Sequence, residues 1–327
     1  MYEAMMMKGA AKLVGVCAAV QAGEEALIVT DAGRDPRIAT VLAQALVAAG
    51  ARPTVMVMTD IATDSAEPNQ AVTAAMRSSA VVFTPLSASI THTSAGQQAC
   101  AGGTRIVNMT QWTAGMMVSG GIDADFVALE PTVRALARVW DNANAVHVTT
   151  AGGTDLRLDI SGRRGTPHAK TGIVRAGEFH PVPDVESPVS PVTAEGRIVC
   201  DASIPYLGIG VLSAPVILDV RDGKVIDITG GRDADTVRKA WAAMNDPAVY
   251  NIAELGVGLN PECRMTGLML EDEGVANTCH IGIGTSVNLG GTVKASCHYD
   301  FLMWDPTIVV DGRVVMDEGR LLVSAGE

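Results

Sequence analysis

Aromatic residues are scarce in this chain: phenylalanine, tryptophan and tyrosine make up 4% of its 327 residues. Alanine, valine and glycine take their place, a profile common in α/β folds. Hydrophobic residues make up 48% and charged residues 18%, so the chain can bury a large core. The length exceeds one typical domain and predicts two.

Positive charge is also in short supply, with 24 Lys and Arg against 36 Asp and Glu, a net charge of −12 and a pI of about 4.9. This balance argues against a nucleic-acid groove and against binding to an anionic membrane surface. We interpret the acidity as a contribution to solubility.

Long apolar runs are absent, since none reaches the roughly 18 uninterrupted residues of a membrane span. The first 20 residues superficially resemble a signal sequence, but Glu3 precedes any basic residue, and Lys8 and Lys12 interrupt the apolar stretch. These positions predict an amphipathic first helix. The six cysteines contain no CxxC, which excludes a disulfide framework and a zinc finger. We therefore expect a cytoplasmic protein.

Nucleotide-binding motifs are missing as well. No GxGxxG follows the first predicted strand, and no GxxxxGK[ST] occurs anywhere. A nucleotide site would need such a loop to bring backbone amides to the phosphates. We therefore expect no nucleotide at the turn after the first strand.

The first 145 residues alternate short β-branched runs with alanine-rich stretches. Strands are predicted at 25–31, 52–60, 80–85 and 104–109, and helices at 36–50, 67–79, 92–103 and 125–144. This alternation predicts an α/β domain over 1–145, with a Rossmann-like parallel sheet and helices on both faces.

From about residue 146 the hydrophobic period changes to two. Strands joined by glycine-containing turns follow, with hairpin turns at Asp222-Gly223 and Asp311-Gly312. One helix interrupts them at 233–246. We predict a mainly antiparallel, β-rich (α+β) metal-binding catalytic domain over 146–327.

Two histidines occur in matching strand-like settings. In "ASCHYDFLMW", His298 and Asp300 stand two apart and project from the same strand face. "NTCHIGIGTS" places His280 in another strand, and the glycine-rich turn between them predicts that the two strands are neighbours.

Two glutamates add to this pattern. Glu254 lies in the apolar strand "NIAELGVGLNP", where a buried carboxylate is costly unless it is paired or bound to a cation. Glu186 lies in the proline-rich run "DVESPVSP", where β-ladder bonding is broken and a side chain can point at a site.

Each residue alone has an ordinary explanation. A single strand histidine is more often a hydrogen-bonded core residue, and a single strand glutamate more often faces solvent. The cysteines beside the two histidines fit core packing, and we interpret "LEDEG" (270–274) as a solvent-exposed loop. Together, however, the acids and histidines form a mixed nitrogen and oxygen site that suits Zn, Mn, Co or Fe(II).

Several stretches resemble, in order, the C-terminal half of the M29 metallo-aminopeptidases (aminopeptidase T-like): "AELGVGLNP", "LEDEGVANTCHIGIG", "NLGGTVKASCHYD" and "PTIVVDGRVV". The resemblance covers most of residues 80–320 and implies two metal ions. The ligands that it implies are Glu186, Glu254, His280, His298 and Asp300. Those peptidases also carry a tyrosine a few residues after the first metal histidine, and "HIGIGTSV" has none.

The stretches "AEGRIVCD", "NDPAVYNIAELGVGLNP" and "CHYD" also resemble the 2,5-dihydroxypyridine 5,6-dioxygenases, ring-cleaving enzymes with one Fe(II) held by His, His and Asp. This resemblance implies His298 and Asp300 as ligands. The family's first histidine falls on Glu254 here, and His280 could substitute for it.

We therefore predict a metal-dependent hydrolase of an amide-type bond, aminopeptidase-like or acting on a cyclic amide or imide, with one or two Zn, Mn or Co ions activating water. Glu254 or Asp300 would bridge the ions, and Glu186 is the candidate general base. The alternative is an Fe(II) ring-cleaving dioxygenase of a dihydroxypyridine-like heterocycle. A non-enzymatic protein with a structural metal is disfavoured, because structural zinc usually has Cys and His ligands.

Further partners follow from these expectations. Arg163, Arg164 and Arg264 are candidates for binding a substrate carboxylate or enolate, because guanidinium binds such groups in a bidentate manner. The substrate would be a small molecule or short peptide, with no nucleic-acid or membrane partner. We expect a homodimer or higher homo-oligomer, as in the resembling families.

Overall fold

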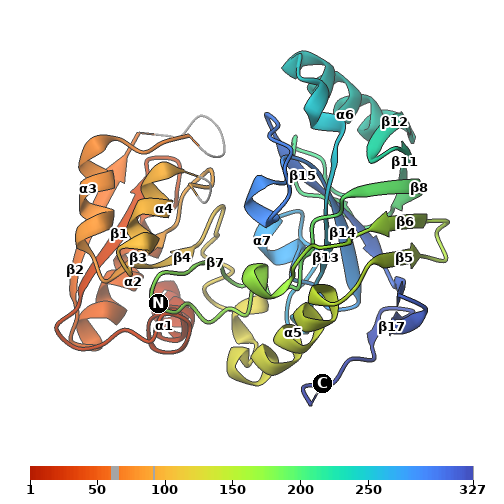
Figure 1. Ribbon diagram of the computed structural model, residues 1–327. Coiled ribbons are helices and arrows are strands. Elements are labelled where there is room, and N and C mark those ends of the chain that lie inside the picture. The colour runs from red at the N-terminus through yellow and green to blue at the C-terminus, as the bar shows by residue number, and fades with distance from the viewer. Residues whose placement is uncertain (60–65, 91–92, 327) are drawn as a thin grey trace. The chain divides into compact units, whose positions relative to one another are not determined.

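The computed structural model describes residues 1–59, 66–90 and 93–326, in two compact units (Figure 1). The first unit contains Met1–Val127 and Thr171–Pro183, and the second contains Ala128–Lys170 and Asp184–Glu327. The division after residue 145 stays a prediction about domains, and these units differ from it in two respects. The long helix that follows residue 125 continues into the second unit, and a short segment returns to the first.

The first unit is built on a five-stranded sheet in the order β2-β1-β3-β4-β7, with every pairing parallel. Its strands are β1 (Glu25–Asp31), β2 (Arg52–Met58), β3 (Val81–Thr84), β4 (Arg105–Asn108) and β7 (Phe179–Pro181). Its helices are α1 (Tyr2–Lys12), α2 (Pro36–Ala48), α3 (Gln70–Ser78) and α4 (Ser94–Ala101), with a short π-helix η1 (Leu13–Cys17) and a short 3-10 helix η2 (Gly121–Asp123). Asp60 and His92, at the ends of two predicted elements, lie outside the described residues.

Helix α2 begins at Pro36, as predicted. The side chain of Asp35 accepts a hydrogen bond from the Arg37 amide and caps the helix. A proline at the first helical position costs no hydrogen bond, because that amide has no partner within the helix.

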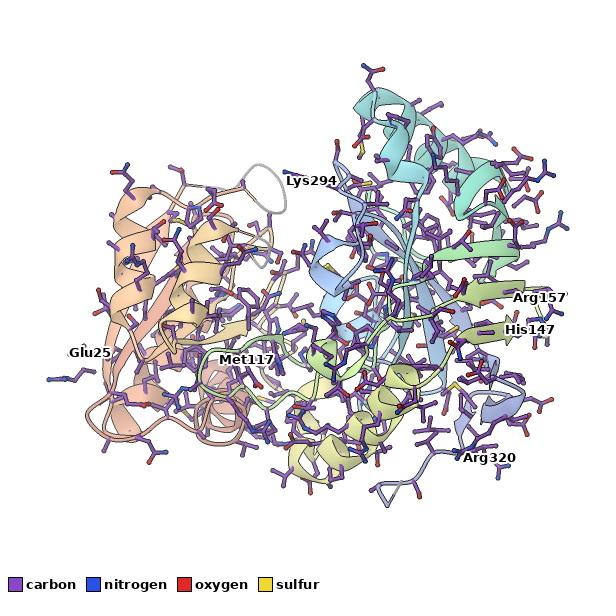
Figure 2. All side chains as sticks on the ribbon, in the orientation of Figure 1. Glu25, Met117, His147, Arg157, Lys294 and Arg320 are labelled. Atoms are coloured by element: carbon purple, nitrogen blue, oxygen red, sulfur yellow. The ribbon has the colours of Figure 1, made fainter. Side chains whose placement is uncertain are left out.

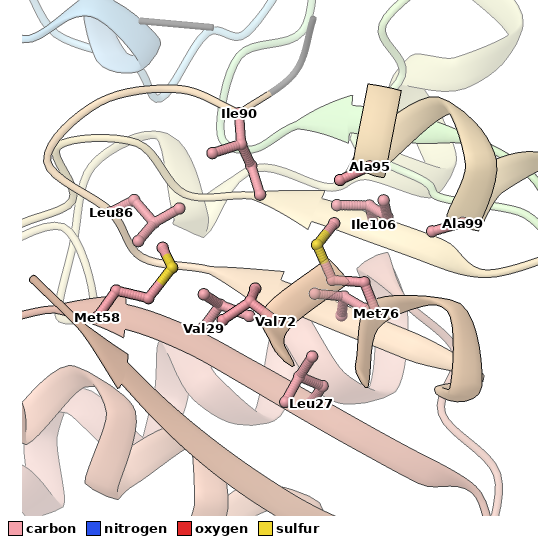
Figure 3. Close-up of a cluster of buried hydrophobic side chains, with 11 residues drawn as sticks. Leu27, Val29, Met58, Val72, Met76, Leu86, Ile90, Ala95, Ala99 and Ile106 are labelled. Atoms are coloured by element: carbon pink, nitrogen blue, oxygen red, sulfur yellow. The ribbon is translucent and has the colours of Figure 1, made fainter. Parts of the chain in front are cut away.

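A cluster of buried apolar side chains joins α3 and α4 to the sheet (Figure 3). Leu27 and Val29 of β1 face this cluster, since alternate strand residues share one face. Val72 and Met76 of α3 and Ala99 of α4 pack against them. Helix α2 contacts β1 and β2 as well. The predicted parallel sheet with covering helices is confirmed.

The second unit contains an eight-stranded antiparallel sheet in the order β12-β11-β8-β6-β5-β16-β17-β18. Its strands are β5 (Ala145–Thr149), β6 (Asp155–Asp159), β8 (Thr193–Cys200), β11 (Val216–Arg221), β12 (Lys224–Thr229), β16 (Thr307–Val310), β17 (Arg313–Asp317) and β18 (Arg320–Leu321). The two predicted hairpin turns join β11 to β12 and β16 to β17.

A three-stranded antiparallel sheet in the same unit contains β13 (Ile252–Val257), β14 (Thr278–Gly284) and β15 (His298–Trp304). The strands β9 (Ser203–Ile204) and β10 (Gly210–Val211) form a small pair. The helical elements are α5 (Phe126–Asp141, which begins in the first unit), η3 (Thr166–His168), α6 (Gly231–Met244), η4 (Pro247–Tyr250), α7 (Met269–Asp272) and η5 (Val287–Leu289). The predicted mainly antiparallel, β-rich half is confirmed.

Strand β6 illustrates why the period of two produces this sheet. Leu156 and Leu158 are buried, whereas Asp155, Arg157 and Asp159 are exposed. Arg157 and His147 of the neighbouring strand β5 project outward (Figure 2). None of the helices in the described chain has both the length and the hydrophobicity that crossing a membrane requires.

Candidate metal centre

Four of the five predicted ligands come from the three-stranded sheet. Glu254 lies on β13, His280 on β14, and His298 and Asp300 on β15. The three strands are direct neighbours, as the matching motifs predicted. Residues two apart share a face and paired residues lie side by side, so these four side chains project from one face of the sheet.

Glu186 reaches the same place from an irregular segment beside β13. The amides of Ser187 and Val189 donate to the carbonyls of Val257 and Leu255, at 3.1 and 2.9 Å. Only isolated bridges join this segment to β13. The proline-rich run therefore lies along the strand and leaves Glu186 directed at the histidines.

Glycines provide the space for the imidazole rings. His280 pairs with Gly256 across the ladder, and Gly282 lies between Glu254 and Asp300. A Cβ atom on Gly256 would lie 2.0 Å from His280 Nε2, and one on Gly282 would lie 2.5 Å from His298 Nε2. The absence of these two side chains lets the rings lie over the neighbouring strands.

The five side chains form two overlapping groups. Glu186, Glu254 and His280 each offer a donor atom within 4.8 Å of the others, and so do Glu254, His298 and Asp300. Glu254 belongs to both. Its Oε1 lies 3.8 Å from His280 Nε2, and its Oε2 lies 2.8 Å from His298 Nε2. One carboxylate therefore stands between the two imidazoles.

The ring of His298 is oriented by the main chain. Its Nδ1 lies 2.7 Å from the carbonyl oxygen of Thr285, which can only accept a hydrogen bond. Nδ1 therefore carries a proton, and in the doubly protonated ring Nε2 donates to Glu254 Oε2 at 2.8 Å. A backbone carbonyl that holds Nδ1–H leaves Nε2 directed at a metal in many metal sites.

The site is deeply buried, and its charges shift one another. Burial raises the pKa of Glu254, but the adjoining imidazoles of His280 and His298 outweigh it and lower the pKa to about 2. Burial lowers the pKa of His280, yet the carboxylates of Glu186 and Glu254 hold that pKa well above its usual range. Burial and the charge of Glu254 both raise the pKa of Glu186. Glu254 therefore stays ionised, and so does Asp300, whose pKa, despite burial, the charge of His298 holds well below its usual range.

The donor set fits a divalent cation. Glu186 Oε2 and Asp300 Oδ1 are buried and have no hydrogen-bond partner among the described residues. They nevertheless lie 3.1 Å from His280 Nε2 and 3.3 Å from His298 Nε2. Burying an acceptor atom without a donor costs free energy. A cation bound jointly by each carboxylate and its neighbouring histidine would satisfy these atoms. Imidazole nitrogens with carboxylate oxygens suit Zn, Mn, Co or Fe(II).

A tyrosine hydroxyl binds the Asp300 oxygen that does not face the histidines. Tyr206 Oη lies 2.7 Å from Asp300 Oδ2 and 3.0 Å from Glu273 Oε1. Burial and the charge of Asp300 raise the pKa of Glu273 well above its usual range. Tyr206 Oη donates to Asp300 Oδ2 and stands between the two carboxyl groups. This arrangement holds Oδ2 and leaves Oδ1 facing the histidines. No sequence motif pointed to Tyr206.

The expectation that "LEDEG" is a solvent-exposed loop is wrong. Glu271, Asp272 and Glu273 are all buried. Asp272 accepts hydrogen bonds from the amides of Thr266 and Gly267 and from Ser203 Oγ, so its charge is compensated inside the fold. Charge density alone could not distinguish this buried turn from a surface loop.

The cysteines beside the histidines do not behave as thiolates. Burial raises the pKa of Cys279 to about 12 and that of Cys297 to about 11. Cys279 is fully buried on the face opposite His280.

The structure does not bring the three candidate arginines to the cluster through any contact recorded among the described residues. Arg163 donates to the carbonyl of Gly290 at 2.5 Å, and Arg164 lies 3.5 Å from Asp141 with an exposed side chain. Arg264 is exposed. Their role in substrate binding stays a prediction.

A cavity of about 760 Å³ lies elsewhere, in the first unit between α2 and β2. Its walls are mostly apolar, and Asp31 is one of the residues that line it. The Asp31 carboxylate already accepts bonds from the Gly33 amide and from the amide and hydroxyl of Ser87. The cavity therefore offers no cluster of reactive groups comparable to that of the second unit.

A buried tryptophan anchors the Glu186 segment, and this gives a stability prediction. Trp140 Nε1 on α5 donates to Ser187 Oγ at 3.0 Å. We expect Trp140→Phe to lower the free energy of unfolding by about 1–3 kcal/mol, because it removes this bond and leaves a buried acceptor. Urea denaturation followed by circular dichroism would measure it.

Trp241 provides the matched control. It is equally buried, but its indole nitrogen has no hydrogen-bond partner among the described residues. Trp241→Phe should cost about 1 kcal/mol less than Trp140→Phe. Equal losses for the two variants would contradict the anchoring role.

The fold and this cluster define an enzyme with a candidate metal centre, and comparisons with known proteins agree. The model of the 2,5-dihydroxypyridine 5,6-dioxygenase (NicX) family matches residues 7–323. The chain belongs to this family. Both resemblances found in the motifs are confirmed.

Individual relatives are more distant. A 2,5-dihydroxypyridine 5,6-dioxygenase of Pseudomonas putida KT2440 is 27% identical over 142 residues, a match that spans 40% of each chain. A solved structure of 2,5-dihydroxypyridine dioxygenase from Pseudomonas putida KT2440 has a TM-score of 0.82 at 19% identity and covers 98% of both chains. The structure of wild-type AmpT from Thermus thermophilus has a TM-score of 0.68 at 14% identity and covers 99% of this chain and 100% of its own. At these identities the two structures show the fold alone.

Proposed function

We propose that this enzyme is a metal-dependent hydrolase of an amide-type bond in a small molecule or short peptide. The observation that carries the proposal is that Glu254 belongs to two ligand groups. One group also contains Glu186 and His280, and the other also contains His298 and Asp300. A carboxylate in that position suits two cations, which is the usual arrangement of dinuclear hydrolases. A single Fe(II) site needs only three protein ligands.

Glu254 and Glu186 differ in the pKa of their carboxyl groups and therefore in their proposed roles. Glu254, with a pKa of about 2, stays ionised and would bridge the cations. Glu186, whose pKa is raised by burial and by Glu254, is the better proton acceptor near neutral pH. Its carboxylate would take a proton from water and return it to the leaving nitrogen as the C–N bond breaks. Bound divalent ions would supply Lewis acidity and lower the pKa of that water.

A second candidate function is Fe(II)-dependent ring cleavage of a dihydroxypyridine-like heterocycle. The family match over residues 7–323 favours it. His298 and Asp300 would be two ligands, with Glu254 or His280 as the third. Against it, Glu254 occupies the position at which the motif resemblance implies a histidine.

The metal content distinguishes the two functions. We expect anaerobically purified protein to contain about two Zn, Mn or Co ions per chain, because two ligand groups are present. Elemental analysis measures this. A chelator should abolish hydrolysis of amide and cyclic imide substrates, and Zn, Mn or Co should restore it.

The opposite result would be equally clear. About one Fe per chain, with oxygen uptake on dihydroxypyridines and no hydrolysis, would contradict the hydrolase and support the dioxygenase. The control is Glu262→Gln, an exposed acid that should change neither metal content nor activity.

A further inference from the structure

A lysine stands directly opposite Glu186 in the fold. The Lys170 amide donates to the Glu186 carbonyl at 2.9 Å, and the Glu186 amide donates to the Lys170 carbonyl at 2.9 Å. When each of two residues donates its amide hydrogen bond to the carbonyl of the other, the two are directly opposed in an antiparallel pair. Their side chains then project to the same side. Because Glu186 points at His280, Lys170 projects toward the same centre.

No hydrogen bond or ion pair of the Lys170 side chain occurs among the residues that the structure describes. The side chain is half-buried, and no carboxylate oxygen in the described ranges lies within 4.0 Å of its ammonium group. It projects to the same side as the Glu186 carboxylate, which lies 3.1 Å from His280 Nε2, and it forms an ion pair with neither residue.

His168 lies on the same side as Lys170 and Glu186. Its imidazole is neutral, so Lys170 is the positively charged group there. Burial, followed by the charge of Lys170, lowers the pKa of His168, while the charge of Glu254 acts against this shift. A Cβ atom on Gly290 would lie 3.3 Å from His168 Nε2, so the glycine-rich turn gives the ring room. A neutral imidazole beside an ammonium group leaves one positive charge at the edge of the centre.

We propose that Lys170 binds a carboxylate of the substrate and restricts the enzyme to acids that carry their negative group near the scissile amide. An unpaired, half-buried ammonium gains most from an anion that arrives with the substrate and displaces water. The inference deepens the proposed function, since it assumes that the cluster around Glu254 is where the substrate binds. It adds an anion-binding residue to the three arginines, whose role stays a prediction.

Binding of product-like acids tests the inference separately from hydrolysis. Isothermal titration calorimetry on the metal-loaded protein would compare dicarboxylates of three to six carbons with monocarboxylates of the same length. We expect at least one dicarboxylate to bind about ten- to a hundredfold more tightly than its monocarboxylate. Lys170→Met should abolish that preference, and Lys170→Arg should retain part of it.

Controls separate this role from a structural one. Lys239→Met, an exposed lysine on α6, should leave the preference unchanged. Metal content and thermal unfolding show whether Lys170→Met remains folded, and Lys170→Arg provides the test if it does not. A wild-type protein without any dicarboxylate preference would overturn the inference, as would a preference that survives in Lys170→Met. If hydrolysis fails while the preference holds, the proposed function fails and the anion site stands.

Discussion

Replacing Glu254 with glutamine is expected to lower kcat/KM for an amide substrate by a factor of about 10³ or more. Glu254 lies between His280 and His298 and belongs to both ligand groups, so the loss of its charge affects both. Glutamine keeps the shape but cannot bridge two cations. Metal analysis should show less than half of the wild-type content.

Glu186→Gln provides the informative comparison, because it removes an acid from only one group. We expect it to lower kcat/KM strongly while one metal ion per chain is retained, which steady-state kinetics and metal analysis would measure together. Full metal content in Glu254→Gln would rule out the bridging role.

Adding a single methyl group beneath either ring is expected to have the second-largest effect. In Gly256→Ala the new Cβ would meet His280 Nε2 at 2.0 Å, and in Gly282→Ala it would meet His298 Nε2 at 2.5 Å. The rings must move by about an ångström, which we expect to cost about a hundredfold in activity. Overpacking should also lower the free energy of unfolding by about 1–3 kcal/mol.

Gly15→Ala is the control for this pair. Gly15 lies in η1, and no other atom lies within 4 Å of a Cβ placed there. Its activity should match that of the wild type, and its unfolding free energy should be unchanged or higher by up to about 1 kcal/mol, because alanine favours a helix over glycine. Activity within twofold of wild type in both Gly256→Ala and Gly282→Ala would show that the imidazole positions do not matter.

The strands that carry the centre could be predicted because their chemistry is local. The spacing of His298 and Asp300 fixes a shared face, and the apolar residues around Glu254 require a buried strand. The glycine-rich sequence after His280 indicated a neighbouring strand, and β14 does pair with β15. Period-two patterns contain this information directly.

The remaining features depend on contacts between segments far apart in the chain. Lys170 meets Glu186 through an isolated bridge between irregular stretches, which have no periodicity. Tyr206 reaches Asp300 from a short loop 94 residues away. The acids of 271–273 are buried because distant hydroxyl and amide groups donate to Asp272. No motif within a single stretch encodes such contacts.

The discontinuous path of the chain also determines how the protein could be dissected. Cutting after Val127 would remove β7 from the edge of the parallel sheet, since Thr171–Pro183 belongs to the first unit. The chain leaves the second unit after Lys170 and re-enters it at Asp184, two residues before Glu186. Lys170 and Glu186 are the hydrogen-bonded pair described above. Paired residues of this kind have Cα atoms about 5.5 Å apart, a gap that a tight turn can close. A gene encoding residues 128–170 joined by such a turn to 184–326 would therefore carry every ligand of the centre in one shortened polypeptide.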